Sequence, residues 1–251
     1  INGHVIYPGE QFSVYEAVNP FTAENGYELA GSYENGTTVQ TYGGGICQVS
    51  TTLYNAVIRA ELSIDERFCH SMIVSYVQPS MDAAIAGTYK DLKFTNNYDF
   101  PVYIEGYTNG GQITFTVYGE ETRPADREVI FESETTSTTE PETKFVASDA
   151  HGIGYVNTDQ NAHTGYTAKL WKIVKENGVE VSREPYNNST YNASPKIVTV
   201  GTKSDSEEAV AAIKAAIATK DEANIRAVAA ANSAEALKKQ EEEEKKQQEE
   251  D

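Results

Sequence analysis

The chain has 251 residues, with 38 Asp and Glu against 20 Lys and Arg and a formal net charge of -18 at pH 7. This length accommodates one domain of ordinary size together with further modules. The acidic balance argues against nucleic acid or an anionic membrane surface as a partner. The two cysteines are too few for a disulfide framework, and the sequence shows no signal peptide or membrane-spanning run.

Short apolar runs separated by Gly, Asn and Pro occupy residues 1–42. They predict short strands and loops, with turns at Pro8-Gly9 and Asn35-Gly36. Residues 47–61 contain no Gly or Pro, and their apolar residues recur at a spacing of three and four, which predicts a helix. Because apolar side chains lie on two neighbouring stripes of this helix, we expect it to be buried.

Segments rich in β-forming residues follow the helix. The predicted strands cover residues 68–78, 90–95, 102–107 and 112–118. Asn109-Gly110-Gly111 is expected to close a hairpin between the last two. The sequence therefore predicts an α+β fold, a mostly antiparallel domain over residues 1–125 built around one buried helix.

The composition changes after residue 125. Residues 126–144 include a run rich in Thr, Ser and Glu, which indicates a linker or an extended strand. Residues 145–203 predict a β-rich module in which strands over 168–176 and 179–183 meet at Asn177-Gly178. Residues 204–251 lack Gly, Pro and aromatic residues and predict an acidic tail, helical or disordered, with little that could bury a core.

Cys47 follows three consecutive glycines, Gly43, Gly44 and Gly45, at the predicted start of the helix. A helix N-terminus favours negative charge and so lowers the pKa of a thiol placed there. Glycines leave the backbone accessible, and the N–H groups from Gly43 to Gln48, that of Ile46 included, are candidates to hold an oxyanion. The pattern predicts a nucleophilic cysteine; the plain alternative is a buried structural one.

The run GGGICQVSTTLYNAVIRAEL, the pair His70-Ser71 and the run DLKFTNN resemble the VanW domain family of bacterial cell-envelope proteins, which is named from a vancomycin-resistance cluster. The segments NGHVIYPGEQFS and GYELAG fit as well, so the resemblance covers roughly residues 1–118. VanW domains look like the catalytic part of some L,D-transpeptidases, so the resemblance implies peptidoglycan crosslinking through a cysteine. The end of the 145–203 module resembles a small cell-wall surface module named for its five glycines; a β extension packed on the first domain is the alternative.

A cysteine nucleophile needs a base, and His70 is the best placed of the four histidines. His4 lies at the edge of the chain, and His151 and His163 belong to the later module. An imidazole can take the thiol proton and keep the sulfur nucleophilic as an ion pair. A buried cysteine beside a hydrogen-bonded structural histidine is the other interpretation.

A Cys47–Cys69 disulfide competes with the dyad of Cys47 and His70. Successive side chains of a strand point to opposite faces. If Cys69 and His70 are extended and His70 faces Cys47, then Cys69 faces away. We favour the dyad, with Cys69 as a small core residue.

The candidates to orient His70 are Asp82, Ser71 and Asp91, of which Asp82 is favoured. The family it resembles usually has a glycine two residues before this aspartate, whereas this chain has Ser80. This difference leaves the conformation of the turn open, but it does not affect the choice of Asp82 as the acid.

Substrate contacts are expected from Arg67, Ser50 and Ser71. Arg67 could grip a stem-peptide carboxylate with two nitrogens, and Lys93 is a weaker candidate; ordinary surface charges are the alternative for both. Ser50, together with Gln48 and Thr51, would either donate to an oxyanion or cap the helix.

No metal, cofactor or nucleotide is expected, because the histidines are scattered and the glycine run lacks the Lys-Ser/Thr of a phosphate loop. The predicted function is L,D-transpeptidase-type acyl transfer on peptidoglycan stem peptides through a thioester. The alternative is a non-catalytic, wall-binding or structural module. Because the chain starts at Ile1, we expect a fragment of a longer secreted or wall-anchored bacterial surface protein, with any membrane contact made through regions outside it.

Overall fold

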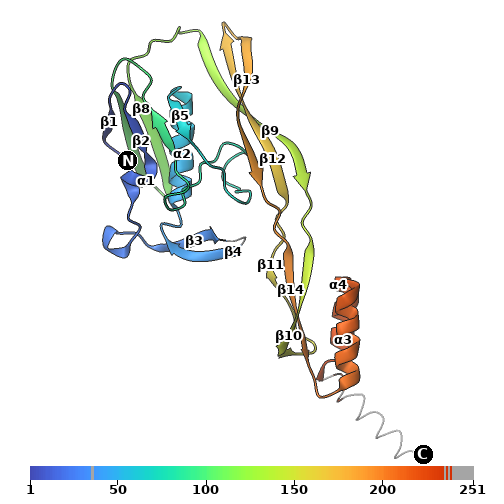
Figure 1. Ribbon diagram of the computed structural model, residues 1–251. Helices are drawn as coiled ribbons and strands as arrows, with labels where there is room; N and C mark the ends of the chain where they lie inside the picture. Colours follow the sequence, from blue (N-terminus) through green and yellow to red (C-terminus); the bar gives the residue numbers. More distant parts are fainter. Residues whose placement is uncertain (35–36, 235, 237, 239–251) are drawn as a thin grey trace, which may run out of the picture. The chain divides into compact units, whose positions relative to one another are not determined.

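The computed structural model describes residues 1–34, 37–234, 236 and 238 (Figure 1). The helices are α1 (Val14–Val18), the 3-10 turn η1 (Ala23–Asn25), α2 (Ile46–Arg59), α3 (Glu207–Thr219) and α4 (Glu222–Ala231). The first eight strands are β1 (His4–Ile6), β2 (Gln11–Ser13), β3 (Leu29–Glu34), β4 (Thr37–Tyr42), β5 (Ser63–Glu66), β6 (Lys93–Thr95), β7 (Val102–Asn109) and β8 (Gln112–Tyr118). The others are β9 (Arg127–Thr139), β10 (Thr143–Gly152), β11 (Val156–Gln160), β12 (Gly165–Glu176), β13 (Val179–Tyr191) and β14 (Lys196–Lys203). The fold is β-rich with few helices, in keeping with the expected α+β class.

The chain forms two compact units. The first comprises residues 1–139 and 165–192, and the second comprises residues 140–164 and 193–251. The chain thus leaves the first unit after β9 and returns to it for β12 and β13. The predicted boundaries at residues 125 and 145 do not coincide with this division.

The described strands of the first unit form four sheets, in the orders β1-β7-β8, β2-β6-β5, β3-β4 and β13-β12-β9. Every pairing between its described strands is antiparallel. Helix α2 packs beside β8 (Figure 1). A single apolar cluster joins α2 to the other three sheets but contains no described residue of β3 or β4, and Phe131 of β9 and Leu170 of β12 belong to it.

Helix α2 supplies much of this core. The predicted helix over residues 47–61 is confirmed, with bounds one to two residues earlier. Its buried residues are Ser50, Thr51, Leu53, Tyr54, Val57 and Ile58. The helix ends where Glu61 adopts a left-handed φ of 58°, a conformation that does not continue a right-handed helix.

The predicted strand over residues 68–78 is wrong, because this segment is a loop with bends. Its backbone groups bond outside any ladder: the His70 N–H donates to Asp82 Oδ2 (2.7 Å), and the Ser71 carbonyl accepts from the Asn192 N–H (2.7 Å). Alternating β-forming residues gave no information about these long-range acceptors and donors. The predicted strand over 90–95 forms only at its second half, as β6.

Both hairpins predicted from Gly-containing turns are present. β7 and β8 pair in register from Tyr103–Tyr118 to Asn109–Gln112. β12 and β13 meet at Asn177 and Gly178, whose φ values of 51° and 76° are the left-handed pair that a tight hairpin turn requires. The predicted turn at Pro8-Gly9 is present, and the one predicted at Asn35-Gly36 lies outside the described residues.

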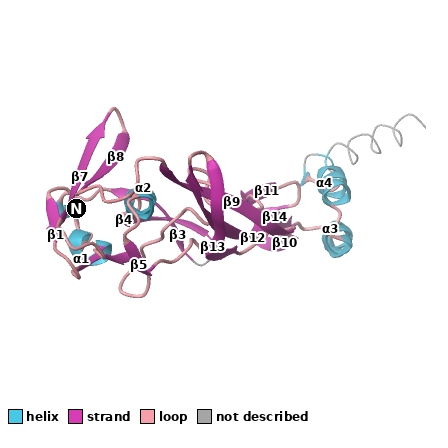
Figure 2. Ribbon diagram, turned by 90° about the horizontal axis from the view of Figure 1, so that it is seen from above, coloured by secondary structure: helices cyan, strands magenta, loops and turns pink. Residues whose placement is uncertain are grey.

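The second unit holds a three-stranded sheet, β10-β14-β11, in which β10 and β14 run parallel and β11 is antiparallel to β14. Helices α3 and α4 pack against each other (Figure 2). Ile213 of α3 and Ile225 of α4 are fully buried in one cluster with Val198 and Val200 of β14. The expectation that residues 204–251 bury little was therefore wrong for α3 and α4, whose small side chains let the helices pack closely. The tail past residue 238 lies outside the described residues.

Glu61 ties the end of α2 to the β13-β12-β9 sheet within the first unit. Its carboxylate accepts hydrogen bonds from Arg127 and is paired with Lys172 of β12 (2.7 Å) and Arg123 (3.3 Å). Burial raises the pKa of this carboxyl, but the hydrogen bonds and charges of the three cations outweigh burial and lower the pKa to about 2. The Glu61 side chain is only 13% exposed, so these bonds are partly shielded from water.

We expect Glu61→Gln to lower the free energy of unfolding of the first unit at pH 7 by about 1–2 kcal/mol, because it leaves three cations without their anion. A carboxyl whose folded pKa is about 2 against an unfolded value of about 4.3 contributes stability above pH 4.3. That contribution disappears as the pH falls toward 2, so the difference between wild type and variant should shrink over this window. The measurement is urea unfolding followed by fluorescence of Trp171, the one tryptophan, which lies on β12. Glu132→Gln, at an exposed pair with Arg183, is the control and should change stability by less than about 0.5 kcal/mol; equal losses in the two variants would contradict the interpretation.

Candidate functional site

A cleft of about 480 Å³ lies at the N-terminal end of α2. The β3–β4 hairpin, the glycine loop, residues 70–76 and residues 84–90 line it. Cys47 and His70 are both among its lining residues. The structure therefore brings the two predicted reactive side chains to one accessible cavity.

The three glycines of the loop, Gly43, Gly44 and Gly45, differ in whether the backbone there requires a glycine. Gly43 has a φ of +80°, which side-chain-bearing residues rarely adopt. A Cβ on Gly44 would lie 2.4 Å from the Ala30 carbonyl oxygen, so only glycine allows β3 this close. A Cβ on Gly45 would meet nothing within 4 Å. The first two glycines thus shape the loop, and the third is not sterically required.

Three of the N–H groups expected to hold an oxyanion are already bonded within the loop. Those of Gly44, Ile46 and Gln48 donate to the carbonyls of Thr41 (3.4 Å), Gly43 (2.9 Å) and Gly45 (3.1 Å) respectively. The expectation is corrected accordingly for these three groups. The Cys47 N–H lies in the first turn, where a helix leaves its own N–H groups without intrahelical partners.

Cys47 is half-buried on the first turn of α2, which begins at Ile46 with Gly45 as its N-cap. Its Sγ lies 3.4 Å from both the carbonyl oxygen and the backbone nitrogen of Ile85. Burial raises the pKa of the thiol, but hydrogen bonding to His70, the charge of His70 and the Ile85 N–H together outweigh burial and lower it. Lys90 adds a smaller effect in the same direction.

His70 is buried and lies between Cys47 and Asp82. Its Nδ1 lies 2.7 Å from Asp82 Oδ2, and the Tyr76 hydroxyl lies 3.3 Å from its Nε2. Burial lowers the pKa of the imidazole, but its hydrogen bonds to Asp82 and Cys47 and their negative charges raise it to about 9. A raised imidazole pKa beside a lowered thiol pKa favours a thiolate–imidazolium pair near neutral pH.

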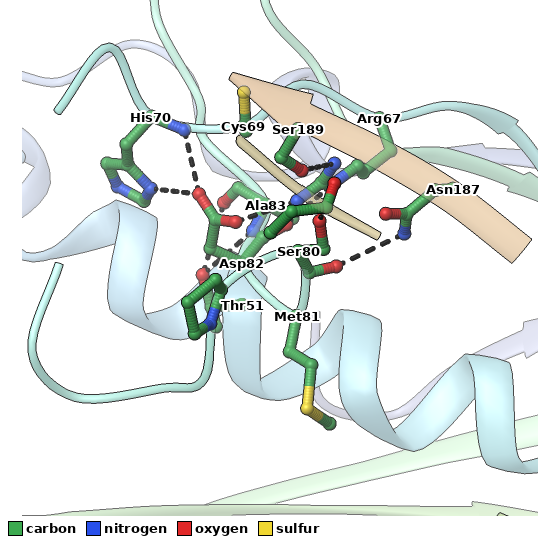
Figure 3. A network of polar contacts seen from close by, with 12 residues as sticks. Thr51, Arg67, Cys69, His70, Ser80, Met81, Asp82, Ala83, Asn187 and Ser189 are labelled. Carbon is green, nitrogen blue, oxygen red and sulfur yellow. Dashed lines mark hydrogen bonds and ion pairs between the residues drawn. The ribbon is translucent and has the colours of Figure 1, made fainter. Parts of the chain in front are cut away.

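Asp82 is fully buried, and both of its oxygens are occupied (Figure 3). Oδ2 accepts from the backbone N–H of His70 (2.7 Å) as well as facing its ring. Oδ1 accepts from Arg67 Nη2 (2.7 Å) and from the Tyr191 hydroxyl (2.5 Å). Burial raises the pKa of this carboxyl, but these hydrogen bonds and the Arg67 charge outweigh burial and lower it. Asp82 is therefore an anion that can orient His70.

Arg67 is not placed to grip a substrate carboxylate, which corrects the prediction. Its side chain is 6% exposed and paired with Asp82. Nε donates to the Asp82 carbonyl (2.6 Å), and Nη1 donates to Ser189 Oγ (2.8 Å). These hydrogen bonds to Asp82 and Ser189 occupy the guanidinium, which the sequence suggested was free to bind a substrate.

Ser50 is likewise buried, and its hydroxyl donates to the Ala83 carbonyl at 2.5 Å. Thr51 Oγ1 accepts from the Ala83 N–H (3.0 Å). Both hydroxyls hold the segment that carries Asp82 against α2, so neither faces a substrate nor caps the helix. Ser71 and Gln48 do line the cleft.

The two other charged candidates lie in different surroundings. Asp91 accepts from Ser13 Oγ (2.5 Å) and from the Tyr15 N–H (2.8 Å) at the start of α1. Lys93 pairs with Glu66 at 2.9 Å. Among the candidates for orienting His70, only Asp82 contacts its ring in the described residues.

Both cysteines are free thiols. Cys69 Sγ lies 3.5 Å from the Thr190 carbonyl oxygen, and its side chain points away from the His70 ring (Figure 3). The opposed directions predicted for these neighbours hold, although they arise in a loop and not in a strand. Cys69 is half-exposed, not the core residue that was expected.

Several contributors to the site escaped sequence analysis. Ile85 and Lys90 affect the thiol, Tyr76 lies beside the imidazole, and Ser189 and Tyr191 reach the Arg67–Asp82 pair. Tyr191 is 109 residues from Asp82 in the sequence. No local spacing links residues so far apart.

The described residues contain no cluster of three His, Cys, Asp or Glu side chains suited to a metal ion. None of the helices described is long and apolar enough to cross a membrane.

Comparison with known proteins divides the chain into two named regions. Residues 1–118 match the family described as VanW like protein, and residues 132–203 match the G5 domain. The chain therefore carries a VanW-like domain followed by a G5 domain. The G5 match is part of the first unit at β9, β12 and β13 and part of the second at β10, β11 and β14.

Two relatives match part of the chain. The "Uncharacterized protein YoaR" of Bacillus subtilis (strain 168) is 40% identical over 121 residues, which are 48% of this chain and 40% of that protein. The "Vancomycin B-type resistance protein VanW" of Enterococcus faecalis (strain ATCC 700802 / V583) is 30% identical over 105 residues, 39% of this chain and 38% of that protein. The chain thus spans less than half the length of these relatives.

Among solved structures, the IgA1 protease G5 domain is 29% identical and matches 31% of this chain and 94% of its own, with a TM-score of 0.24. HP0197-G5 is 11% identical and matches 30% of this chain and 99% of its own, with a TM-score of 0.18.

Burial raises the pKa of the Cys47 thiol and His70 lowers it, so removal of the imidazole should raise this pKa. We expect His70→Ala to raise the apparent pKa of Cys47 alkylation by iodoacetamide by about one unit or more, because the cation that stabilises the thiolate is lost. Labelling at Cys47 is separated from that at Cys69 by peptide mass, and circular dichroism checks the fold. His163→Ala, in the second unit, is the control and should leave the curve unchanged. Superimposable curves for wild type and His70→Ala would show that His70 does not govern the thiol.

Proposed function

We propose that the chain is part of a cell-envelope enzyme that performs L,D-transpeptidase-type acyl transfer on peptidoglycan stem peptides. The Cys47 thiolate attacks a peptide carbonyl, and an S–C bond forms. The C–N bond then breaks, and the departing amine takes a proton from the His70 imidazolium. The product is a thioester on Cys47.

In the second step, the amine of a neighbouring stem attacks the thioester. His70 takes the proton released by that amine, the new amide bond forms, and the C–S bond breaks to restore the thiolate. Water in place of the amine would give hydrolysis. Every atom and electron pair is thus supplied by the two peptides, Cys47 and His70.

The observation that carries this proposal is that Cys47 and His70 line one cleft, while the buried Asp82 contacts Nδ1 of His70. A nucleophile beside a base that a third group orients is the arrangement needed for covalent acyl transfer. Asp82 faces Nδ1, so we assign the proton exchange to the other imidazole nitrogen, Nε2, which the Tyr76 hydroxyl also approaches (3.3 Å). The relatives support the cell-envelope setting, since one is named a vancomycin B-type resistance protein.

We assign stabilisation of the tetrahedral oxyanion to the first turn of α2, with the Cys47 N–H as its first donor. A helix N-terminus adds a favourable field for negative charge. Ser71 and Gln48, at the margin of the cleft, are the proposed contacts with the peptide.

A second candidate is a non-catalytic, wall-binding or structural module. The G5 match over residues 132–203 favours it, because that region alone could account for attachment to the cell wall. The two functions differ in thiol chemistry: a filler Cys47 would be alkylated slowly in the folded protein, whereas a thiolate would react below the free-thiol pKa of about 8.5.

Incubation with stem-peptide muropeptides tests the enzymatic proposal. We expect wild type to form a thioester, seen as a mass adduct on the peptide that contains Cys47, and to release crosslinked or exchanged products. Cys47→Ala should abolish both, because no other group in the mechanism can form the acyl-enzyme. Cys69→Ala makes the same chemical change on the neighbouring thiol and should keep at least about half of the activity, since Cys69 takes no part in the chemistry. Full activity in Cys47→Ala would disprove the mechanism, and absence of adduct with a slowly alkylated Cys47 would leave the binding module as the function.

A further inference from the structure

The last part of β13 runs along the loop that carries His70 and Asp82. The Cys69 thiol donates to the carbonyl oxygen of Thr190. The N–H of Asn192, just beyond the strand, donates to the Ser71 carbonyl. Ser189 accepts from Arg67. These contacts lie at the end of β13 and just beyond it, so the loop runs along this end of β13 and does not form a strand of its own.

Tyr191 makes the contact closest to the reacting groups. Its buried hydroxyl donates to Asp82 Oδ1 (2.5 Å) and accepts from the backbone N–H of Ser80 (2.7 Å). One side chain therefore holds both the carboxylate and the turn that precedes it. Both interactions are buried, where an unpaired polar group is costly.

The turn at Ser80 shows how closely the loop fits the sheet. Ser80 is fully buried with a φ of +66°, a conformation that glycine adopts readily and serine does not. Its Oγ donates to the Ala168 carbonyl of β12 (3.1 Å), and Asn187 Nδ2 of β13 donates to its carbonyl (3.1 Å). Ser80 thus bonds the turn to the sheet through both its side chain and its carbonyl.

We propose that Tyr191 is a positioning residue of the site, which acts on the Cys47–His70 pair by holding the Asp82 carboxylate in the orientation that His70 needs. The β13 strand is accordingly part of the functional site, although it lies in the G5 region and outside the VanW-like match. The inference takes its chemical meaning from the proposed acyl transfer, but the geometry and its test concern only the thiol and its partners.

The arrangement around Asp82 explains why one hydroxyl matters. Oδ2 must face both the N–H and the ring of His70 (Figure 3), while Oδ1 accepts hydrogen bonds from Arg67 and Tyr191. Removing the Tyr191 hydroxyl leaves Arg67 as the donor on Oδ1 and leaves the Ser80 N–H without its acceptor. The carboxylate can then turn toward Arg67, which weakens its bond to His70.

The test is the pH dependence of Cys47 alkylation in the full chain carrying Tyr191→Phe. A weaker bond between Asp82 and His70 makes the imidazolium less stable, so the thiolate loses its partner at lower pH. We expect the apparent pKa of Cys47 to rise by at least about 0.5 pH unit. The titratable and charged groups around the pair are Tyr54, Arg67, Tyr76, Asp82, Lys90 and Tyr191, and of these the variant removes only the Tyr191 hydroxyl.

Tyr166→Phe is the matched control. Tyr166 lies on β12 directly opposite Tyr191, so this variant removes a hydroxyl from the same end of the same sheet without touching Asp82. Its alkylation curve should superimpose on that of wild type. A shift of similar size in both variants would mean that the effect comes from the sheet as a whole and would overturn the assignment to Tyr191.

An unchanged or lowered pKa in folded Tyr191→Phe also overturns the proposal, because the carboxylate would then hold His70 without help. If circular dichroism shows that this variant does not fold, Ser189→Ala decides. It removes an acceptor of Arg67, the other donor on Oδ1, and should raise the pKa in the same direction by a smaller amount; an unchanged curve there rejects the role of β13. Absence of muropeptide activity in wild type would refute the proposed acyl transfer. The alkylation result, and with it the role of Tyr191, would be unaffected.

Discussion

The buried carboxylate of Asp82 is the constraint on which the site depends. Removing a carboxylate from water costs several kcal/mol unless charges and hydrogen bonds replace the solvent. Here Arg67, Tyr191 and two groups of His70 make that replacement, and they come from separate parts of the chain. The loop before Asp82 and the end of β13 are therefore fixed by the need to satisfy one anion.

This requirement explains why the loop over residues 68–78 is irregular. A strand would point its N–H and carbonyl groups at a neighbouring strand, whereas the His70 N–H is needed at Asp82. β13 supplies side chains and single backbone groups in place of a ladder. Regular secondary structure is found instead at α2, which has only to place one side chain: its first turn presents Cys47 to the cleft.

The parts that the sequence predicted are those specified locally. The spacing of apolar residues located α2, and the pair Asn177-Gly178 located the β12–β13 turn, where the structure has two left-handed residues. Cys47, His70 and Asp82 could be nominated because residue type and the helix start restrict the choice. The role of Arg67 could not be predicted, because the sequence around an arginine in a loop does not show whether its side chain faces solvent or a buried carboxylate. Tyr191 lay beyond any local pattern, since only the folded sheet brings it to Asp82.

The charges of the site alternate, which gives Arg67 a reason to be buried. Arg67, Asp82, His70 and Cys47 form a series of cation, anion, cation and anion when the thiolate–imidazolium pair is present, and the sum is zero. In the proposed reaction, acylation neutralises the sulfur and proton transfer to the departing amine neutralises His70, so the sum stays zero. A site that keeps its net charge through the proposed reaction avoids the desolvation cost of an unpaired buried ion at either stage. Without Arg67, the buried series would carry a net negative charge in both states, which would favour protonation of Asp82 and loosen its hold on His70.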